Sequence, residues 1–384
     1  MVFIYFQNKK MMEKEEKLYR LATRNRKAVL KRLLKVSLYG IVGGFAGSLI
    51  FVLLGVTLGD VGIGYLWLVA LLAMLIKMRF MCFSYAGGII SLSSLLFGWP
   101  DINVPSILII VAVLHFMESI LIRLNGYERP LPLSLKGKEG KAYGVFLLQK
   151  MWPLPFVAMI VLAVSNGALL EGSVLDMPGW WPLIESTVQA EPQKTVMYFL
   201  IPVAAGLGYG DLAAARTPRK KAAQTSSDLL LYSLVLLGLA LGGAYFPPLL
   251  FGAALFSPIG HEYVIKQGQK SIKKEQAVYQ PPDSGVLILD VYSGGQAERK
   301  GLNRGDIVTA VNGTGVNNYW EFWHNFNGQR VSLELLSGEI IRLETQAQTP
   351  GLVVLNDQPQ REFNQLTKGQ SILNQLFNKI KGGI

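Results

Sequence analysis

The chain has 384 residues, of which 51% are hydrophobic, and it carries a formal net charge of +11. Its positive mean hydropathy is high for a soluble protein and favours a polytopic membrane domain joined to a soluble module. No nucleic-acid motif accompanies the basic charge, so nucleic-acid binding is not expected. The single cysteine, Cys82, excludes an internal disulfide, and we expect neither a cysteine-based metal site nor any other cofactor.

The chain begins with an apolar heptapeptide, MVFIYFQ, which is too short to cross a bilayer and is followed by basic residues. A signal peptide carries its charges before its apolar run, so this start is not one. We interpret residues 1–35 as a basic cytoplasmic segment. The apolar start is either a free, partly inserted end or the remnant of a longer first span.

Apolar stretches dominate residues 36–265, which we predict to be the transmembrane domain. The hydropathy predicts about eight helical spans, at 36–58, 63–78, 80–99, 104–123, 153–170, 195–210, 229–246 and 247–264. The last two meet at Phe246-Pro247-Pro248, so they are either two spans or one long kinked element. Basic and acidic loops alternate along the chain, and the positive-inside rule therefore places both termini in the cytoplasm. The basic cytoplasmic face also predicts attraction to anionic lipid.

Ionisable residues in the predicted spans are candidates for function. His261-Glu262 begins the His-Glu-x-x-His motif of zinc proteases, but position 265 is Ile, so the motif fails. We interpret this pair as a structural boundary that has a partner among neighbouring helix ends. His115 and Glu118 lie three residues apart on one helical face, and we favour an inter-helix polar contact for them. We therefore predict no catalytic residue, no metal site and no enzymatic activity.

The run from Gly285 to Gly313, GVLILDVYSGGQAERKGLNRGDIVTAVNG, predicts a β-rich α+β module. An apolar strand at 286–289 precedes a short helix at 296–300, and a second strand follows at 307–311. The turn positions of this motif are Gly285, Gly301, Gly305, Asp306, Asn312 and Gly313. The order of elements resembles the core of a bacterial PDZ domain, a fold that binds peptides by adding a strand to a sheet edge.

The binding strand of this module is expected after the core and not before it. Residues 266–283 have the composition of a linker, so the domain is assigned to 284–356. Alternating strands at 330–336 and 339–345 precede a Gly-Leu loop and an apolar strand, an arrangement that resembles circularly permuted bacterial PDZ domains. The residues predicted to bind peptide are Gly351, Leu352, Val353, Val354, Tyr319 and Trp323.

A predicted helix at about 317–327 would form the opposite wall of the groove. Its aromatic residues share one helical face. For Phe322 and Phe326 we favour packing on the sheet, whereas for Tyr319 and Trp323 packing and ligand contact both remain open. Residues 357–384 form an amphipathic tail that docks on the PDZ domain or lies on the membrane surface.

Four segments carry a resemblance that covers most of the chain: RFMCFSYAGGIISL, LHFMESILIRLNGYERP, FLLQKMWPLP and FSPIGHEYVI. Together with a permuted PDZ domain, they resemble the MinJ-type membrane proteins of Gram-positive bacteria. The usual Ser-Pro-Ala-Glu before the short helix is Gly295-Gln296-Ala297-Glu298 here, and the first span of the family is not evident.

This resemblance implies a non-enzymatic topological determinant of cell division, located in the cell membrane at septa and poles. Its implied partners are a DivIVA-like scaffold, a MinC/MinD-like inhibitor and other division proteins, and we also consider self-association. Two alternatives are an inactive relative or regulatory partner of an intramembrane protease, and a transporter with an accessory PDZ domain.

Overall fold

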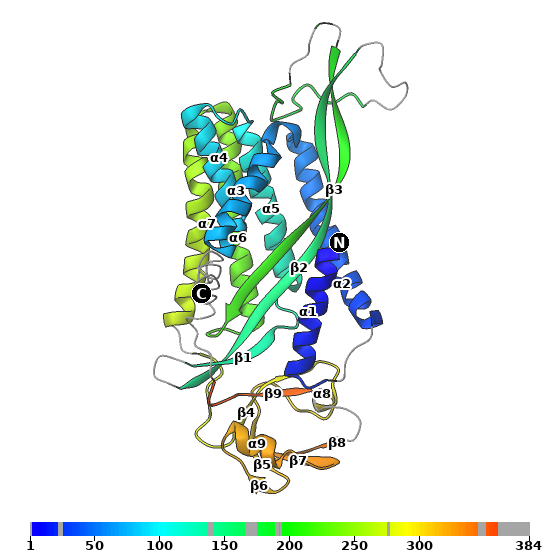
Figure 1. The fold of residues 1–384 in the computed structure, drawn as a ribbon, viewed down its shortest axis with the longest axis vertical. Coiled ribbons are helices and arrows are strands. Elements are labelled where there is room, and N and C mark those ends of the chain that lie inside the picture. The colour runs from blue at the N-terminus through cyan, green and yellow to red at the C-terminus, as the bar shows by residue number, and fades with distance from the viewer. Residues whose placement is uncertain are drawn as a thin grey trace, which may run out of the picture.

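The computed structural model describes residues 2–21, 26–136, 141–165, 175–188, 192, 194–274, 277–344 and 351–359. A helical bundle and a long β-hairpin stand side by side, and a small β-rich domain lies beneath one end of both (Figure 1). Most of the predicted amphipathic tail, from residue 360 onward, lies outside the described residues.

The bundle contains six helices, preceded by a separate N-terminal helix, α1 (Val2–Leu18). They are α2 (Arg26–Leu54), α3 (Ile63–Ile76), α4 (Phe83–Phe97), α5 (Val104–Asn125), α6 (Pro218–Tyr245) and α7 (Pro248–Lys274), with 3-10 turns η1 (Gly59–Val61) and η2 (Met78–Met81). Among the described residues, three helical stretches are long and apolar enough to cross a membrane: Val29–Leu54, Val104–Asn125 and Pro218–Tyr245. The apolar helices α3 and α4 are shorter.

The chain around Phe246 and Pro247 forms two separate helices, because α6 ends at Tyr245 and α7 starts at Pro248. The two helices pack against each other along the bundle. Helix α7 then continues to Lys274, so the stretch expected to be a linker, 266–283, begins inside a helix.

Two of the eight predicted spans are strands, so the predicted span count is wrong. The stretches at 153–170 and 195–210 fall mainly on β2 (Ala142–Ser165) and β3 (Lys194–Ala213), which pair antiparallel; β1 (Leu131–Lys136) pairs with the other edge of β2. The span count was wrong because hydropathy measures how apolar a stretch is and does not measure the period at which its apolar residues recur. The period-two run of Gly206, Gly208 and Gly210 and the prolines at 153 and 155 disfavour a helix.

Helix α2 lies directly on the backbone of strand β2. A Cβ atom at Gly40 would collide with the carbonyl oxygen of Pro153, and one at Gly44 would collide with that of Pro155. One turn further along, the Ser48 hydroxyl accepts a hydrogen bond from the Val157 N–H at 2.8 Å. On a neighbouring face of α2, a Cβ at Gly43 would meet Leu121 and one at Gly47 would meet Met117, so the glycines bring this helix close to both β2 and α5.

The C-terminal domain is a mixed α+β unit with its own core. Its elements are β4 (Val286–Val291), α8 (Gln296–Arg299), β5 (Ile307–Val311), β6 (Thr314–Gly315), α9 (Tyr319–Asn325), β7 (Arg330–Leu335), β8 (Ile340–Glu344) and β9 (Leu352–Val354). The sheet order is β8-β7-β5-β4-β9, and β6 pairs with β5. Among the described residues, the C-terminal strand β9 thus lies beside β4, the first strand of the domain.

This domain packs closely against the base of the hairpin. Leu287 and Leu289 of β4 point away from the domain's own core and join the large apolar cluster that includes β2 and the bundle. The guanidinium of Arg304 lies 4.4 Å from the ring centroid of Phe146 in β2. The backbone N–H of Asn356 donates to the Ser134 hydroxyl at 2.9 Å. These contacts fix the domain at one end of the hairpin.

Buried charges lie where α1, α2 and the hairpin meet. Arg32 of α2 and Glu15 of α1 form an ion pair of 2.6 Å, and both side chains are less than a tenth exposed. Lys150 of β2 is also buried. Burial and the nearby charge of Arg32 lower the pKa of Lys150 to about 7, although Glu128 and Glu15 act in the opposite direction.

Candidate peptide-binding groove

The predicted motif residues occupy the turns that shape the C-terminal domain. Gly285, Gly301, Gly305, Asn312 and Gly313 all have positive φ. At Gly285 a Cβ would also meet the Val308 carbonyl oxygen, so β4 and β5 approach closely there. The Asp306 carboxylate accepts from the Asn303 N–H at 2.7 Å, which holds the loop before β5.

Strand β9 is at one end of the sheet order formed by the described residues. It pairs antiparallel with β4 through Asp290↔Val353 and Val291↔Leu352. Gly351, just before the strand, has φ +68°, and its carbonyl accepts from the Tyr292 N–H at 2.6 Å. Leu352 and Val354 are buried in the core of the domain, whereas Val353 packs on the hairpin side. A Gly-Leu turn therefore leads directly into an edge strand.

Helix α9 presents two kinds of aromatic residue. Phe322 is fully buried, and Phe326 packs partly buried against the same core, as we favoured from the sequence. Tyr319 and Trp323 are also partly buried, and the Trp323 indole N–H is buried without a hydrogen-bond partner among the described residues. That unsatisfied donor is suited to a carbonyl from a bound chain.

A small pocket lies between the start of α9 and the end of β9. It is lined by Pro281, Pro282, Gly285, Val286, Leu287, Asn317, Asn318, Tyr319, Leu355 and Asp357. The Tyr319 N–H donates to the Asp357 carboxylate at 3.1 Å, which joins the helix to the chain after β9.

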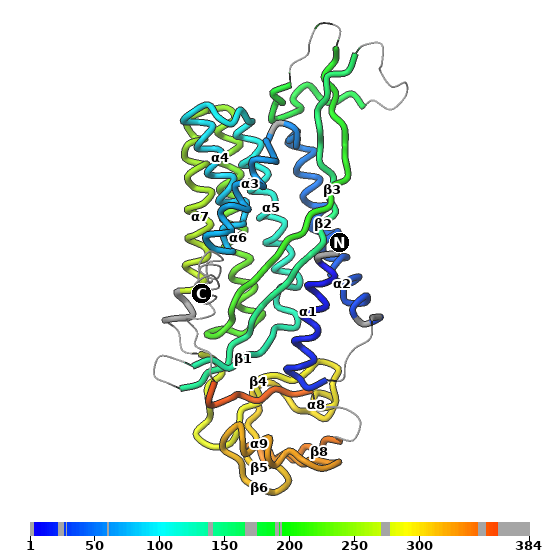
Figure 2. The backbone as a smooth tube through the Cα atoms, in the orientation of Figure 1, coloured from blue at the N-terminus to red at the C-terminus, as the bar shows by residue number. Residues whose placement is uncertain are grey.

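The end of α1 contacts this predicted groove, which the sequence did not indicate. Arg20 lies 3.5 Å above the ring of Trp323, a cation–π contact. Leu21 approaches the other wall: its Cδ2 would be 3.6 Å from a Cβ built on Gly351. Figure 2 shows α1 running down beside the hairpin to reach the C-terminal domain near β9.

A hydrogen bond between Tyr19 and Asp290 fixes this contact. The Tyr19 hydroxyl donates to Asp290 Oδ2 at 2.6 Å, and Arg304 donates twice to Oδ1, at 2.7 and 2.9 Å. Burial, and then the Asp290 charge, raise the pKa of Tyr19, so its phenol remains a donor at physiological pH. Burial also raises the pKa of Asp290, while Arg304 acts in the opposite direction.

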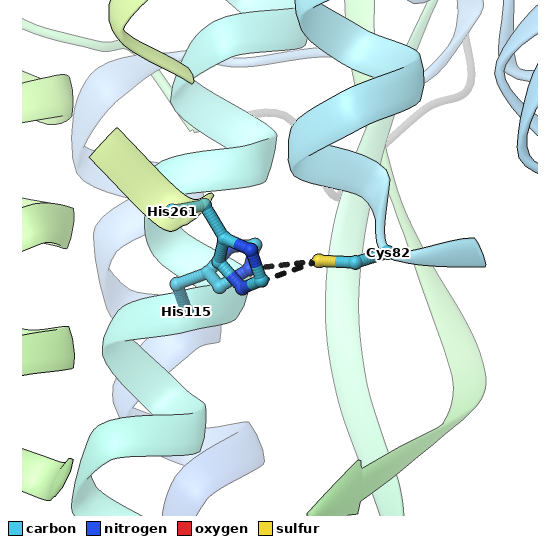
Figure 3. Close-up of side chains that lie close together, drawn as sticks. All are labelled: Cys82, His115 and His261. Atoms are coloured by element: carbon cyan, nitrogen blue, oxygen red, sulfur yellow. Dashed lines mark hydrogen bonds between the residues drawn. The ribbon is translucent and has the colours of Figure 1, made fainter. Parts of the chain in front are cut away.

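Of the four ionisable residues singled out in the predicted spans, His115, His261 and Glu262 lie in two contacts inside the bundle, and Glu118 lies one helical turn after His115. Glu262 of α7 accepts from Arg79 at 2.9 Å and from the Tyr85 hydroxyl at 2.7 Å, so its partners come from the η2 turn and α4. His115 of α5 lies 3.1 Å from the sulfur of Cys82. His261 approaches the same sulfur from α7 (Figure 3).

Comparison with known proteins supports the two main features. Residues 259–321 match the PDZ domain family, and the sheet described above continues beyond this match to Val354. The chain is also 24% identical over 240 residues to "Cell division topological determinant MinJ" of Bacillus subtilis (strain 168). That alignment takes in 62% of this chain and 56% of the Bacillus protein. The chain thus contains a PDZ domain, carries helices apolar enough for a membrane and is distantly similar to MinJ.

Proposed function

We propose that this protein is a non-enzymatic membrane adaptor that helps to place the division site. The observation that carries the proposal is the edge strand β9, which begins after Gly351 and packs in the same core as the aromatic face of helix α9. A peptide that adds to β9 would place its backbone along Leu352–Val354 and its side chains against Tyr319 and Trp323. If the peptide ends there, its carboxylate would meet backbone N–H groups near Gly351.

The charge distribution supports a cytoplasmic groove and a multi-pass membrane domain. The first turn of helix α6 carries Arg219 and Lys220, and the last turns of α7 carry Lys266, at the end of the bundle that faces the PDZ domain (Figure 1). Near the C-terminal end of α2, which lies at the opposite end of the bundle, the Trp181 indole donates to the Val52 carbonyl at 2.7 Å. Basic residues favour the cytoplasmic side, where anionic lipid also attracts them, and tryptophan favours an interface.

The partners follow from the similarity to a division determinant. We propose that the groove and the membrane domain together connect a DivIVA-like scaffold to a MinC/MinD-like inhibitor. Tethering at one membrane site would raise the effective concentration of weakly binding partners, so that modest affinities suffice. Such a protein would be enriched at septa and poles.

We further propose that the end of α1 competes for the groove. Arg20 and Leu21 contact Trp323 and Gly351, which are two of the residues predicted to bind a partner. A partner would have to displace this segment. The partner's apparent affinity would therefore decrease as the fraction of molecules with a closed groove increases.

Localisation of a fluorescent fusion tests the proposal. The wild-type protein should concentrate at septa and poles, and this pattern should disappear in cells without the scaffold. Trp323→Ala should weaken the enrichment. The matched control is Trp320→Ala on the same helix, whose side chain is 68% exposed, and it should behave as wild type. A uniform membrane signal for the wild-type protein would refute the division-site role, and equal behaviour of the two variants would refute the groove.

A further inference from the structure

The only cysteine of the chain and two of its three histidines meet inside the helical bundle. Cys82 precedes α4, His115 lies in the middle of α5, and His261 lies on α7. Figure 3 shows the three side chains pointing toward one another. The sequence pattern singled out both histidines but did not place them beside Cys82, because the three residues are far apart in the chain.

The ligand atoms are close enough together to share one tetrahedral metal ion, and the longer of the two sulfur–nitrogen separations matches the metal-bound value. Cys82 Sγ lies 3.1 Å from His115 Nε2 and 3.7 Å from His261 Nε2, and the three groups offer ligand atoms within 4.8 Å of one another. Zinc–sulfur and zinc–nitrogen bonds of about 2.3 and 2.0–2.1 Å at a tetrahedral angle give a sulfur–nitrogen separation of about 3.6 Å. The Ser84 hydroxyl donates to the same sulfur at 3.3 Å, a hydrogen bond of the kind that supports a metal-bound thiolate.

The surroundings orient the histidines as metal ligands. His115 Nδ1 lies 2.7 Å from the Val111 carbonyl oxygen, so Nδ1 carries the proton and Nε2 directs its lone pair at the cluster. His261 Nδ1 is buried without a hydrogen-bond partner among the described residues. The ring of His261 is instead held between Tyr85 and Tyr232, at centroid distances of 5.4 and 5.7 Å.

We propose that Cys82, His115 and His261 form a zinc site that joins α4, α5 and α7. One thiolate and two neutral imidazoles suit zinc, and they leave a fourth position for water or for a carboxylate. Glu118 lies one helical turn after His115 but is not among the groups whose ligand atoms lie within 4.8 Å of one another, so water is the simplest fourth ligand. The metal would fix the junction between η2 and α4 against the two long helices.

Zinc binding to the purified full-length protein tests this site. After treatment with a chelator under reducing conditions, the protein should take up one zinc ion per chain. Cys82→Ser, His115→Gln and His261→Gln should each lower zinc affinity by at least about 100-fold, because the loss of a residue that only hydrogen-bonds to a metal ligand already costs about 10–100-fold. His324→Gln changes the remaining histidine, which lies in α9, and should bind zinc as the wild type does.

Two measurements on the wild-type protein do not depend on how the variants fold. Cobalt in place of zinc should give a thiolate-to-metal charge-transfer absorption, and zinc should slow alkylation of Cys82, the only thiol in the chain. The proposal is overturned if the wild-type protein binds no zinc stoichiometrically, if cobalt gives no thiolate band, or if Cys82→Ser binds zinc as tightly as the wild type.

Discussion

Replacing Tyr19 by Phe removes one hydroxyl and leaves the ring packed against Tyr292, whose centroid is 5.4 Å away. The hydroxyl donates to Asp290, which is only 4% exposed, and a hydrogen bond to a charged group contributes about 1.5–3 kcal/mol. Asp290 keeps both hydrogen bonds from Arg304, so the PDZ domain should remain folded. About 1.4 kcal/mol corresponds to a tenfold change in an equilibrium constant. The equilibrium constant for closing the α1 contact should therefore fall by about 10–100-fold.

Amide hydrogen exchange of the full-length protein measures this opening. Residues 16–21 should exchange about 10–100-fold faster in Tyr19→Phe, while the core strands of the PDZ domain should keep their protection. Tyr5→Phe is the matched control, because it lies on the same helix and its ring contacts only the neighbouring Phe6 among the ring contacts described. Exchange at 16–21 that stays within twofold of wild type would show that the Tyr19–Asp290 hydrogen bond does not hold the segment on the groove.

Two further substitutions test the contact between α2 and β2 and the buried lysine of β2. Gly44→Leu should lower the thermal midpoint of the full-length protein by several degrees, because its Cβ would collide with the Pro155 carbonyl. Gly238→Leu, where nothing lies within 4 Å of the added Cβ, is the control and should have little effect. Equal shifts in the two variants would contradict the contact between α2 and β2. The lowered pKa of Lys150 means that the unfolded chain binds more protons than the folded one above about pH 7, so stability should rise from pH 7 toward pH 10 by up to about 1.4 kcal/mol per pH unit. Lys150→Met should flatten that rise in thermal midpoint, and an unchanged slope would exclude Lys150 as its source.

The PDZ domain was predictable because its signals are local. Glycine and asparagine at positive φ mark turns in the sequence itself, as at Asn312-Gly313, and alternating strands such as 330–336 show their own period. A strand after Gly351 was expected from the resemblance to permuted PDZ domains, but its pairing with β4, which joins Val291 to Leu352, was not predicted.

The hairpin and the two buried contacts were not predictable in this way. The apolar stretches at 153–170 and 195–210 have the composition of spans, and only their proline and alternating glycine content indicates strands. The cluster of Cys82, His115 and His261 depends on how three helices pack, and the contact of Tyr19 with Asp290 depends on where α1 lies on the hairpin. Such long-range arrangements have no local period to reveal them.

If a partner peptide lies between β9 and α9, site-specific photocrosslinking in living cells should capture it there. A photoreactive phenylalanine analogue at position 323 should crosslink to a division protein, with a yield that increases when Tyr19→Phe weakens the α1 contact. The same analogue at position 320, on the exposed side of α9, should give no such product. Identical products from both positions, or no product from position 323 with or without Tyr19→Phe, would contradict a peptide-binding groove at this edge.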